Sequence, residues 1–175
     1  MLTITQALAL EHRVFSGLFD QIEQTLPGFD ALAEVHLLAR SVEGLLRQHS
    51  EAEDELVALA LAEGARHRRW CRALLQQHQE IDSSLTGARA TGHLGQARRL
   101  LRAAIAASRR HFEFEDRVVF PRLENVLPKE TLTRLGRIWF QQRDWRVVYG
   151  LTGLLHLRLD RRRIRRLACV RAVPA

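Results

Sequence analysis

Two short stretches of this 175-residue chain, HSEAE at residues 49–53 and HFEFE at residues 111–115, share the pattern His-x-x-x-Glu. Residues four apart lie one above the other on an α-helix, so each stretch would put an imidazole beside a carboxylate. Both stretches lie within runs in which apolar residues recur every three or four positions, the spacing of a helix with one buried face. The sequence therefore predicts two long helices, each with a His–Glu pair on its buried face.

Two further apolar stripes each contain one histidine, His12 and His78. His12 precedes the first motif by 37 residues and His78 precedes the second by 33, which indicates two related helical hairpins. Strand-forming clusters are missing, and glycine and proline are scarce, so the expected class is all-α. The stripes predict helices over about residues 5–26, 30–62, 66–86 and 93–127.

The connections between these helices are expected to be short, at Pro27-Gly28, near Gly64 and over residues 87–92. Short connections make consecutive helices antiparallel neighbours, which predicts an up-down-up-down four-helix bundle. Pro121 lies inside the fourth helix and is expected to kink it. At about 1.5 Å per helical residue, His49 and His78 lie at matching heights, whereas His78 and His111 are staggered by up to roughly 15 Å.

Six buried polar side chains on one set of stripes need partners, because an uncompensated buried charge costs several kcal/mol. A first-row divalent metal would supply the missing charge, and imidazole with carboxylate suits such ions. In the alternative interpretation, each glutamate pairs with an arginine at the bundle rim and His12 and His78 are ordinary core histidines. The repeat favours a metal site, with these expected ligands: His12, His49, Glu53, His78, His111 and Glu115.

Charge is distributed unevenly along the chain. Residues 1–128 hold 15 basic and 17 acidic residues, a net of −2, whereas residues 129–175 hold 12 basic and 3 acidic residues, a net of +9. We expect residues 1–128 to be the bundle and residues 129–175 to be a basic C-terminal extension that starts with a fifth helix. Apolar residues of that helix would pack on the bundle: Leu132, Leu135, Ile138 and Trp139.

An arginine cluster after residue 150 predicts an anionic partner, either a membrane surface or nucleic acid. A solvated terminus is the alternative. The cluster comprises Arg161, Arg162, Arg163, Arg165 and Arg166. No secretory signal or membrane-spanning run is expected, and Cys71 and Cys169 do not form a disulfide framework, so the expected compartment is the cytoplasm.

The chain resembles the hemerythrin-like (HHE cation-binding) domain family over about residues 5–128. The resemblance is carried by EHRVFSGLFDQIE (11–23), LRQHSEAEDELVALAL (46–61), QHQEIDSSL (77–85) and HFEFEDRVVFPRLE (111–124). It implies a non-haem di-iron centre held by the six residues named above, with Glu53 and Glu115 as bridges. Oxygen-carrying hemerythrins have a fifth histidine on the third helix, where this chain has Leu74 and Asp82.

The resemblance and the ligand pattern together predict a protein that binds or senses O2 or NO, or that handles iron and oxidative stress. A metal-binding, sensing or carrier protein is favoured over an enzyme. Asp82 or water would replace the fifth histidine, and Asp116 would be an alternative to Glu115 as a bridge. The alternative is a mononuclear site, or a site for another divalent metal, in a helical module whose arginine-rich tail docks to a membrane surface, nucleic acid or a protein.

Overall fold

The computed structural model describes residues 1–62 and 68–142. These residues are helical with short connections and contain no strand, which confirms the all-α class. The elements are α1 (Ile4–Thr25), a 3-10 turn η1 (Leu26–Gly28), α2 (Leu32–Ala62), α3 (Arg68–Ala90), α4 (Leu94–Phe114), a π-helical turn η3 (Glu115–Val119), α5 (Phe120–Val126) and α6 (Lys129–Gln142).

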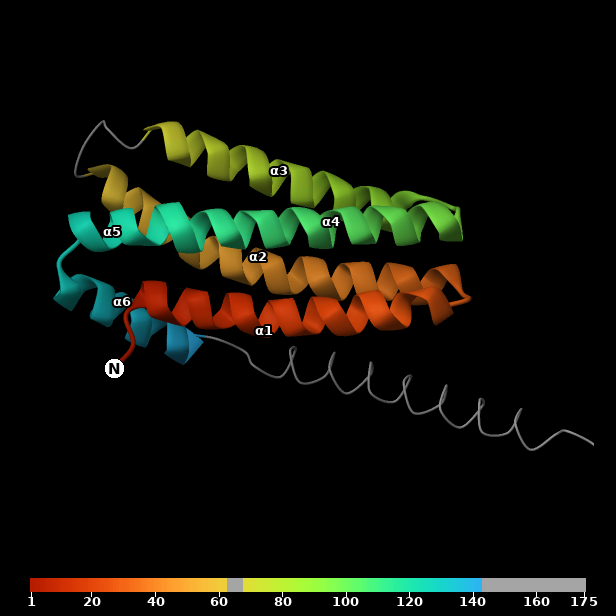
Figure 1. Cartoon of the computed structure of the whole chain (residues 1–175), viewed down its shortest axis with the longest axis horizontal. Coiled ribbons are helices and arrows are strands. Elements are labelled where there is room, and N and C mark those ends of the chain that lie inside the picture. The colour runs from red at the N-terminus through yellow and green to blue at the C-terminus, as the bar shows by residue number, and fades with distance from the viewer. Residues whose placement is uncertain (63–67, 143–175) are drawn as a thin grey trace, which may run out of the picture.

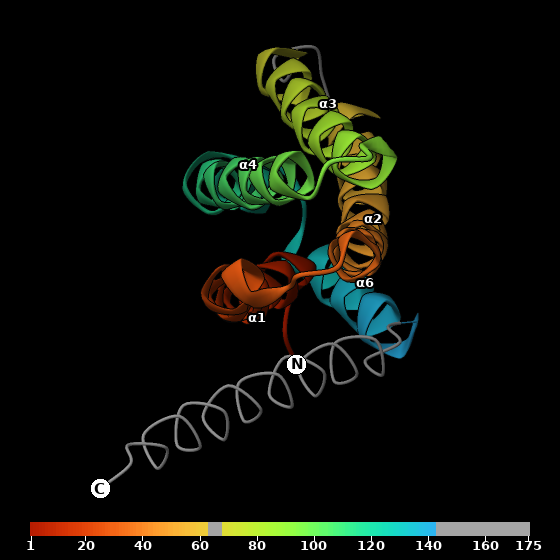
Figure 2. The same ribbon diagram turned by 90° about the vertical axis from the view of Figure 1, so that its right-hand side faces the viewer.

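The four long helices lie side by side along the length of the molecule (Figure 1). In that view α1 and α3 run from left to right, and α2 and α4 run from right to left. Seen from the end, the four helices surround a common interior, and α6 lies outside this group and packs against α1 (Figure 2). Among the described residues, none of the helices combines the length and the apolar character needed to cross a bilayer.

The first helix begins at a capping box. The Thr3 hydroxyl accepts a hydrogen bond from the Gln6 backbone N–H at 3.3 Å, and the Gln6 side chain accepts one from the Thr3 N–H at 3.1 Å. Each bond satisfies a donor that the helix itself cannot pair. The polar residues before Ala7 therefore fix where α1 starts.

The third helix is longer than the sequence predicts. It continues through residues 87–90, which the glycines indicated as a loop, and the turn comprises only residues 91–93. Gly87 lies at a close contact, because a Cβ atom there would lie 3.2 Å from a methyl group of Leu100 on α4. The glycine lets α3 and α4 approach each other, and the helix remains regular.

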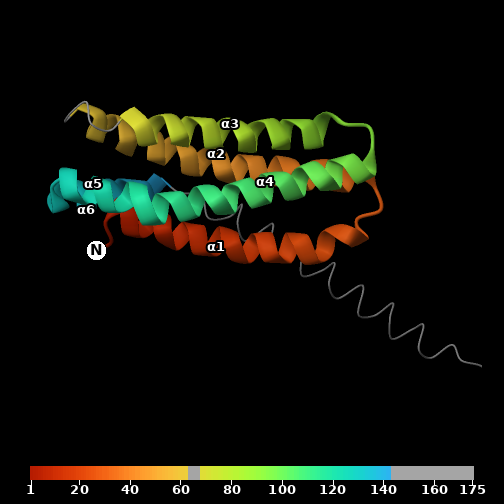
Figure 3. The same ribbon diagram turned by 45° about the horizontal axis from the view of Figure 1, so that its top comes forward.

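The fourth helix passes through a π-helical turn where the sequence predicts a proline kink. The Phe120 N–H donates to the Glu115 carbonyl, five residues back, which is the π-helical pattern. Pro121 follows at the start of α5 and, as a proline, has no N–H to donate. The ribbon of α4 nevertheless runs on into α5 along one line (Figure 3).

The buried residues form two apolar clusters with a polar layer between them. On α1 the layer lies between Leu8 and Phe15, and on α3 between Leu74 and Ile81. On α2 it lies between Leu46 of one cluster and Leu56 of the other. Each long helix thus passes from one apolar cluster to the other through the layer that contains its histidine.

The sixth helix closes one end of the molecule. Leu132 and Trp139 are buried in the same apolar cluster as Ile4, whereas Ile138, which the sequence placed in that contact, is exposed. A Cβ atom on Gly136 would lie 2.5 Å from the Leu2 carbonyl oxygen, so α6 crosses the N-terminal residues at backbone contact. The arginine cluster at residues 161–166 lies outside the described residues.

Candidate metal centre

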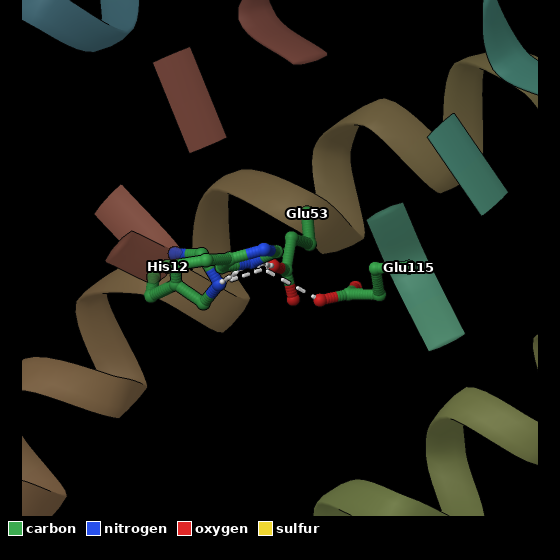
Figure 4. A group of neighbouring side chains, drawn as sticks. His12, Glu53 and Glu115 are labelled. Atoms are coloured by element: carbon green, nitrogen blue, oxygen red, sulfur yellow. Dashed lines mark hydrogen bonds and ion pairs between the residues drawn. The ribbon is translucent and has the colours of Figure 1, made fainter. Parts of the chain in front are cut away.

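The structure brings all six expected ligands together in the polar layer. His12 comes from α1, His49 and Glu53 from α2, His78 from α3, His111 from the last turn of α4, and Glu115 from the first position of η3. His78 is half-buried, and the other five residues are buried. Figure 4 shows the side chains of His12, Glu53 and Glu115 pointing toward one another between the helices. The predicted stagger of His78 and His111 is wrong, since their Nε2 atoms lie 3.0 Å apart; the continuation of α3 to Ala90 accounts for part of the difference.

The histidines meet in two pairs through their Nε2 atoms. Nε2 of His12 lies 2.9 Å from Nε2 of His49, and Nε2 of His78 lies 3.0 Å from Nε2 of His111. One pair joins α1 to α2 and the other joins α3 to α4. The centre therefore has two halves, one for each helical hairpin of the sequence repeat.

The Glu53 carboxylate lies between the two pairs. Its Oε1 lies 2.5 Å from His49 Nε2 and 3.8 Å from His12 Nε2. Its Oε2 lies 3.6 Å from His78 Nε2 and 3.7 Å from His111 Nε2. One carboxylate oxygen thus faces each pair, which is the arrangement a bridging ligand requires.

The Glu115 carboxylate also spans the two halves, since its Oε2 lies 3.4 Å from His12 Nε2 and 3.3 Å from His111 Nε2. Two groups of side chains have ligand atoms all within 4.8 Å of one another. The first group is His12, His49, Glu53 and Glu115, and the second is Glu53, His78 and His111. Each group can hold a metal ion, and they share Glu53.

The outer nitrogens of three histidines are held by acceptors. Nδ1 of His12 lies 2.9 Å from Asp116 Oδ1, and Nδ1 of His49 lies 2.8 Å from Glu11 Oε2. Nδ1 of His111 lies 2.9 Å from the Gln77 side-chain oxygen. Carboxylate and amide oxygens only accept, so each Nδ1–H donates and the Nε2 lone pair is free to bind a cation.

The centre contains acceptors that no donor satisfies. Both oxygens of Glu53 and Oε2 of Glu115 are buried and have no hydrogen-bond partner among the described residues. Buried carboxylates without donors are costly, and two nitrogen lone pairs that face each other at 2.9 Å need a proton or a cation between them. The donor set therefore fits a divalent metal.

Protons would take the place of the metal in its absence. Burial lowers the pKa of His12, but the neighbouring carboxylates of Asp116, Glu115 and Glu53 outweigh it and raise the pKa to about 11. Burial also lowers the pKa of His49, and the Glu53 charge and the hydrogen bond to Glu11 raise it to about 9. Metal ions must therefore displace protons from these imidazoles at neutral pH.

The two carboxylates respond to burial differently. Burial raises the pKa of Glu53, but the neighbouring histidines, His49 first, outweigh it and hold the pKa below its usual value. Burial raises the pKa of Glu115, and the negative charge of Glu53 raises it further. Two anionic side chains this close are stable only when positive charge lies between them.

A model of the hemerythrin HHE cation-binding domain family matches residues 3–123. The chain belongs to this family. No curated protein and no solved structure matched it. The match covers the part of the chain in which all six histidine and glutamate residues lie, so the HHE domain supports a metal-binding module here.

Two carboxylates have roles other than those expected from the sequence. Asp116 was the alternative to Glu115 as a bridge, but in this HHE domain it contacts the outer nitrogen of His12 and lies outside both ligand groups. Asp82 was the candidate replacement for a fifth histidine, yet it also lies outside both groups and lines an open groove beside His78. The partners Glu11 and Gln77 each precede a ligand histidine by one residue, and this adjacency was their only signal in the sequence.

Aromatic rings fill the side of the centre that faces the larger apolar cluster. The Phe112 ring stacks on the His12 ring with centroids 4.2 Å apart and meets the His49 ring edge-on at 5.4 Å. Phe15 also meets His49 edge-on at 5.4 Å. These rings keep water from that side of the histidines and restrict their rotation.

Proposed function

We propose that this HHE domain is an up-down-up-down antiparallel four-helix bundle that holds a carboxylate-bridged, non-haem di-iron centre. The ligands would be His12, His49, Glu53, His78, His111 and Glu115. The observation that carries the proposal is that two potential ion groups share Glu53. A single-ion site would leave one facing pair of histidines without a cation between the Nε2 atoms.

Iron bound in this way would supply open coordination positions and electrons for binding or reducing O2 or NO. The residues of the chain would balance the charge of the iron, orient its ligands and exclude water. Glu53 and Glu115 balance the charge of the cations, and the Nδ1 partners fix the direction of the imidazoles. Phe112, Phe15 and Leu46 exclude water on the inner side.

The proposed role is binding or sensing of O2 or NO, or handling of iron under oxidative stress, in the cytoplasm. Anaerobic reconstitution with ferrous iron, followed by metal analysis, should give two ions per chain. Titration with O2 and with NO, followed by optical spectroscopy, then separates the possible gas ligands. A replacement of both His49 and His111 by alanine should abolish iron binding, and retained iron would place the site elsewhere.

The alternative is a module for one ion, or for another divalent metal, that docks through its basic extension. The net charge of +9 over residues 129–175 supports an anionic partner for Arg161, Arg162, Arg163, Arg165 and Arg166. Binding to anionic vesicles and to duplex DNA, each measured at low and high salt, tests this role. Replacement of the five arginines by glutamine should abolish such binding and leave the metal content unchanged.

A further inference from the structure

A groove on the outside of the bundle leads toward one half of the metal centre. It lies between α2 and α3 and has a volume of about 730 Å³. Ser50, His78 and Asp82 line this groove and also line a smaller cavity of about 20 Å³. His49 and His111 line that smaller cavity as well, so the two spaces meet beside three of the four histidines.

His78 is the ligand at which the centre meets this groove. Its side chain is 17% exposed, whereas those of His12, His49 and His111 are at most 3% exposed. An ion that arrives from solvent through the groove therefore meets His78 first. Glu53 follows, with Oε2 3.6 Å from His78 Nε2 and without a hydrogen-bond donor.

The charges that line the groove divide into ion pairs and charges without such a pair. Arg89 forms a close ion pair with Glu43, and Arg47 lies 3.9 Å from Glu51, so these four charges cancel.

The remaining lining charges are Arg40, Asp54 and Asp82. Asp82 lies one helical turn after His78, and Asp54 lines the same groove from α2. The two carboxylates next to the ligand histidine attract cations, and Arg40 lies about four helical turns before Asp54 on α2.

The sizes of the two spaces match the stepwise loss of water by a cation. An ion with six waters occupies about 200 Å³ at roughly 30 Å³ per water, and the groove accommodates it. The cavity behind His78 has room for about one water-sized body. An ion that passes this point must exchange its waters for protein ligands.

We propose that this groove is the access route for the metal: a hydrated divalent cation enters between α2 and α3, is held at Asp54 and Asp82, and passes to His78 and the buried ligands. The proposal rests on the proposed metal-binding function. It adds that loading is directional and that residues outside the ligand set control its rate.

The first test obstructs the groove. Gly44 lines it on α2, and a Cβ atom there would meet nothing within 4 Å, so Gly44→Leu places a side chain in the route without a clash at its first atom. Gly17→Leu on the exposed face of α1 is the matched control, since its Cβ also meets nothing within 4 Å. Uptake of Co2+ by metal-free protein, followed by stopped-flow absorption, should be at least tenfold slower in Gly44→Leu and unchanged in Gly17→Leu.

The second test removes the charges of Asp54 and Asp82. Asp54→Asn with Asp82→Asn should slow Co2+ uptake about tenfold at low ionic strength. The difference should shrink in 1 M salt, where the screening length is about 3 Å. Asp20→Asn with Glu23→Gln is the control, because it removes two carboxylates that pair with Arg109 on another face.

The final Co2+ content, compared with the uptake rate, distinguishes the proposed access route from the proposed metal-binding function. Equal final Co2+ content in all variants, with slow uptake only in the groove variants, supports the access route. Wild-type uptake rates in both groove variants would overturn the route and leave metal binding intact. A wild-type protein that takes up no Co2+ and no Fe2+ would overturn the proposed function itself.

Discussion

Replacement of Glu53 by glutamine tests the shared ligand most directly. Glu53 is buried, belongs to both potential ion groups, and lies within 3.8 Å of all four histidine Nε2 atoms. Glutamine has the same shape but no charge, and its NH2 group cannot bind a cation. Through a single substitution, one half of the centre therefore loses its oxygen, and the other keeps only a neutral amide oxygen.

The expected loss follows from ligand linkage. A metal at 100 times its Kd stabilises the folded protein by about 2.7 kcal/mol, so two ions contribute about 5 kcal/mol. For a domain of this size 1 kcal/mol corresponds to about 2–4 °C in Tm, which gives a metal-dependent rise of about 10–20 °C. In Glu53→Gln we expect a rise below about 5 °C.

The metal-free variant should remain folded. Removal of one partner from a buried ion pair costs about 3–5 kcal/mol when the other charge has no alternative. Here the other partners are histidines, among them His12 and His49, which can release their protons when the carboxylate is gone. The Tm of the metal-free variant should therefore stay within a few degrees of the metal-free wild-type protein.

Differential scanning fluorimetry with and without excess Co2+, together with metal analysis, measures both quantities. Glu51→Gln is the control, because Glu51 lies two residues earlier on the same helix and is exposed. If Glu53→Gln binds two ions per chain with the wild-type rise in Tm, Glu53 is not a ligand and the shared-ligand reasoning is refuted.

Three further perturbations probe the surroundings of the centre. Asp116→Asn keeps an acceptor for His12 Nδ1 but removes its charge, and it should weaken metal affinity about tenfold in a chelator competition titration. Metal binding at pH 7 should release protons, because the pKa values of His12 and His49 are raised to about 11 and about 9. The metal affinity should therefore rise with pH from 6 to 9. Calorimetry in buffers of different ionisation enthalpy measures both the proton release and the affinity. For the same reason, the folded metal-free protein binds more protons than the unfolded chain. The contribution of His12 and His49 to the free energy of unfolding is therefore largest below pH 6.5 and falls as the pH rises through 9 toward 11. Urea unfolding at a series of pH values measures this change. Gly136→Ala forces α6 away from Leu2 and should cost about 1–3 kcal/mol in a urea titration without changing metal content.

Two control variants test whether the changes in metal affinity and in stability are specific to Asp116 and Gly136. Asp20→Asn removes an exposed charge on α1 and should leave metal affinity unchanged. Gly95→Ala should leave stability nearly unchanged, because a Cβ atom there meets nothing within 4 Å. A pH-independent metal affinity would contradict the protonated metal-free centre, and an unchanged stability of Gly136→Ala would contradict the backbone contact.

The meeting of the six candidate ligand residues could be predicted because its signal is local. His49 with Glu53, and His111 with Glu115, lie one turn apart on stripes whose period identifies the buried face. The helical class followed from the same stripes. The structure brings these residues together as the pattern predicted.

The bounds of the turn between α3 and α4 could not be predicted, because a glycine occurs both in turns and where two helices lie close together. Gly87 and Gly92 together indicated a flexible loop, but only Gly92 lies in the turn. Gly87 faces Leu100, so the helix contact determined the residue, and that contact exists only once α3 and α4 pack. Part of the apparent stagger of His78 and His111 came from this ambiguity.

The partners of the imidazole Nδ1 atoms also depend on tertiary structure. Glu11 lies on α1 and reaches a histidine of α2, and Gln77 on α3 reaches a histidine of α4. Asp116 reaches His12 on α1 from within the π-helical turn. Sequence spacing carries no signal for contacts between helices or for a π-helical turn.

The contact of α6 with the first residues of the chain has a consequence for synthesis on the ribosome. About 130 residues separate Ile4 from Gly136, and at about 5–20 residues per second their translation takes roughly 7–26 s. Throughout that interval Ile4 and Leu8 have no α6 to cover them, and α1 emerges before α6 is complete. A nascent chain stalled before α6 would therefore present this apolar end of α1 to chaperones.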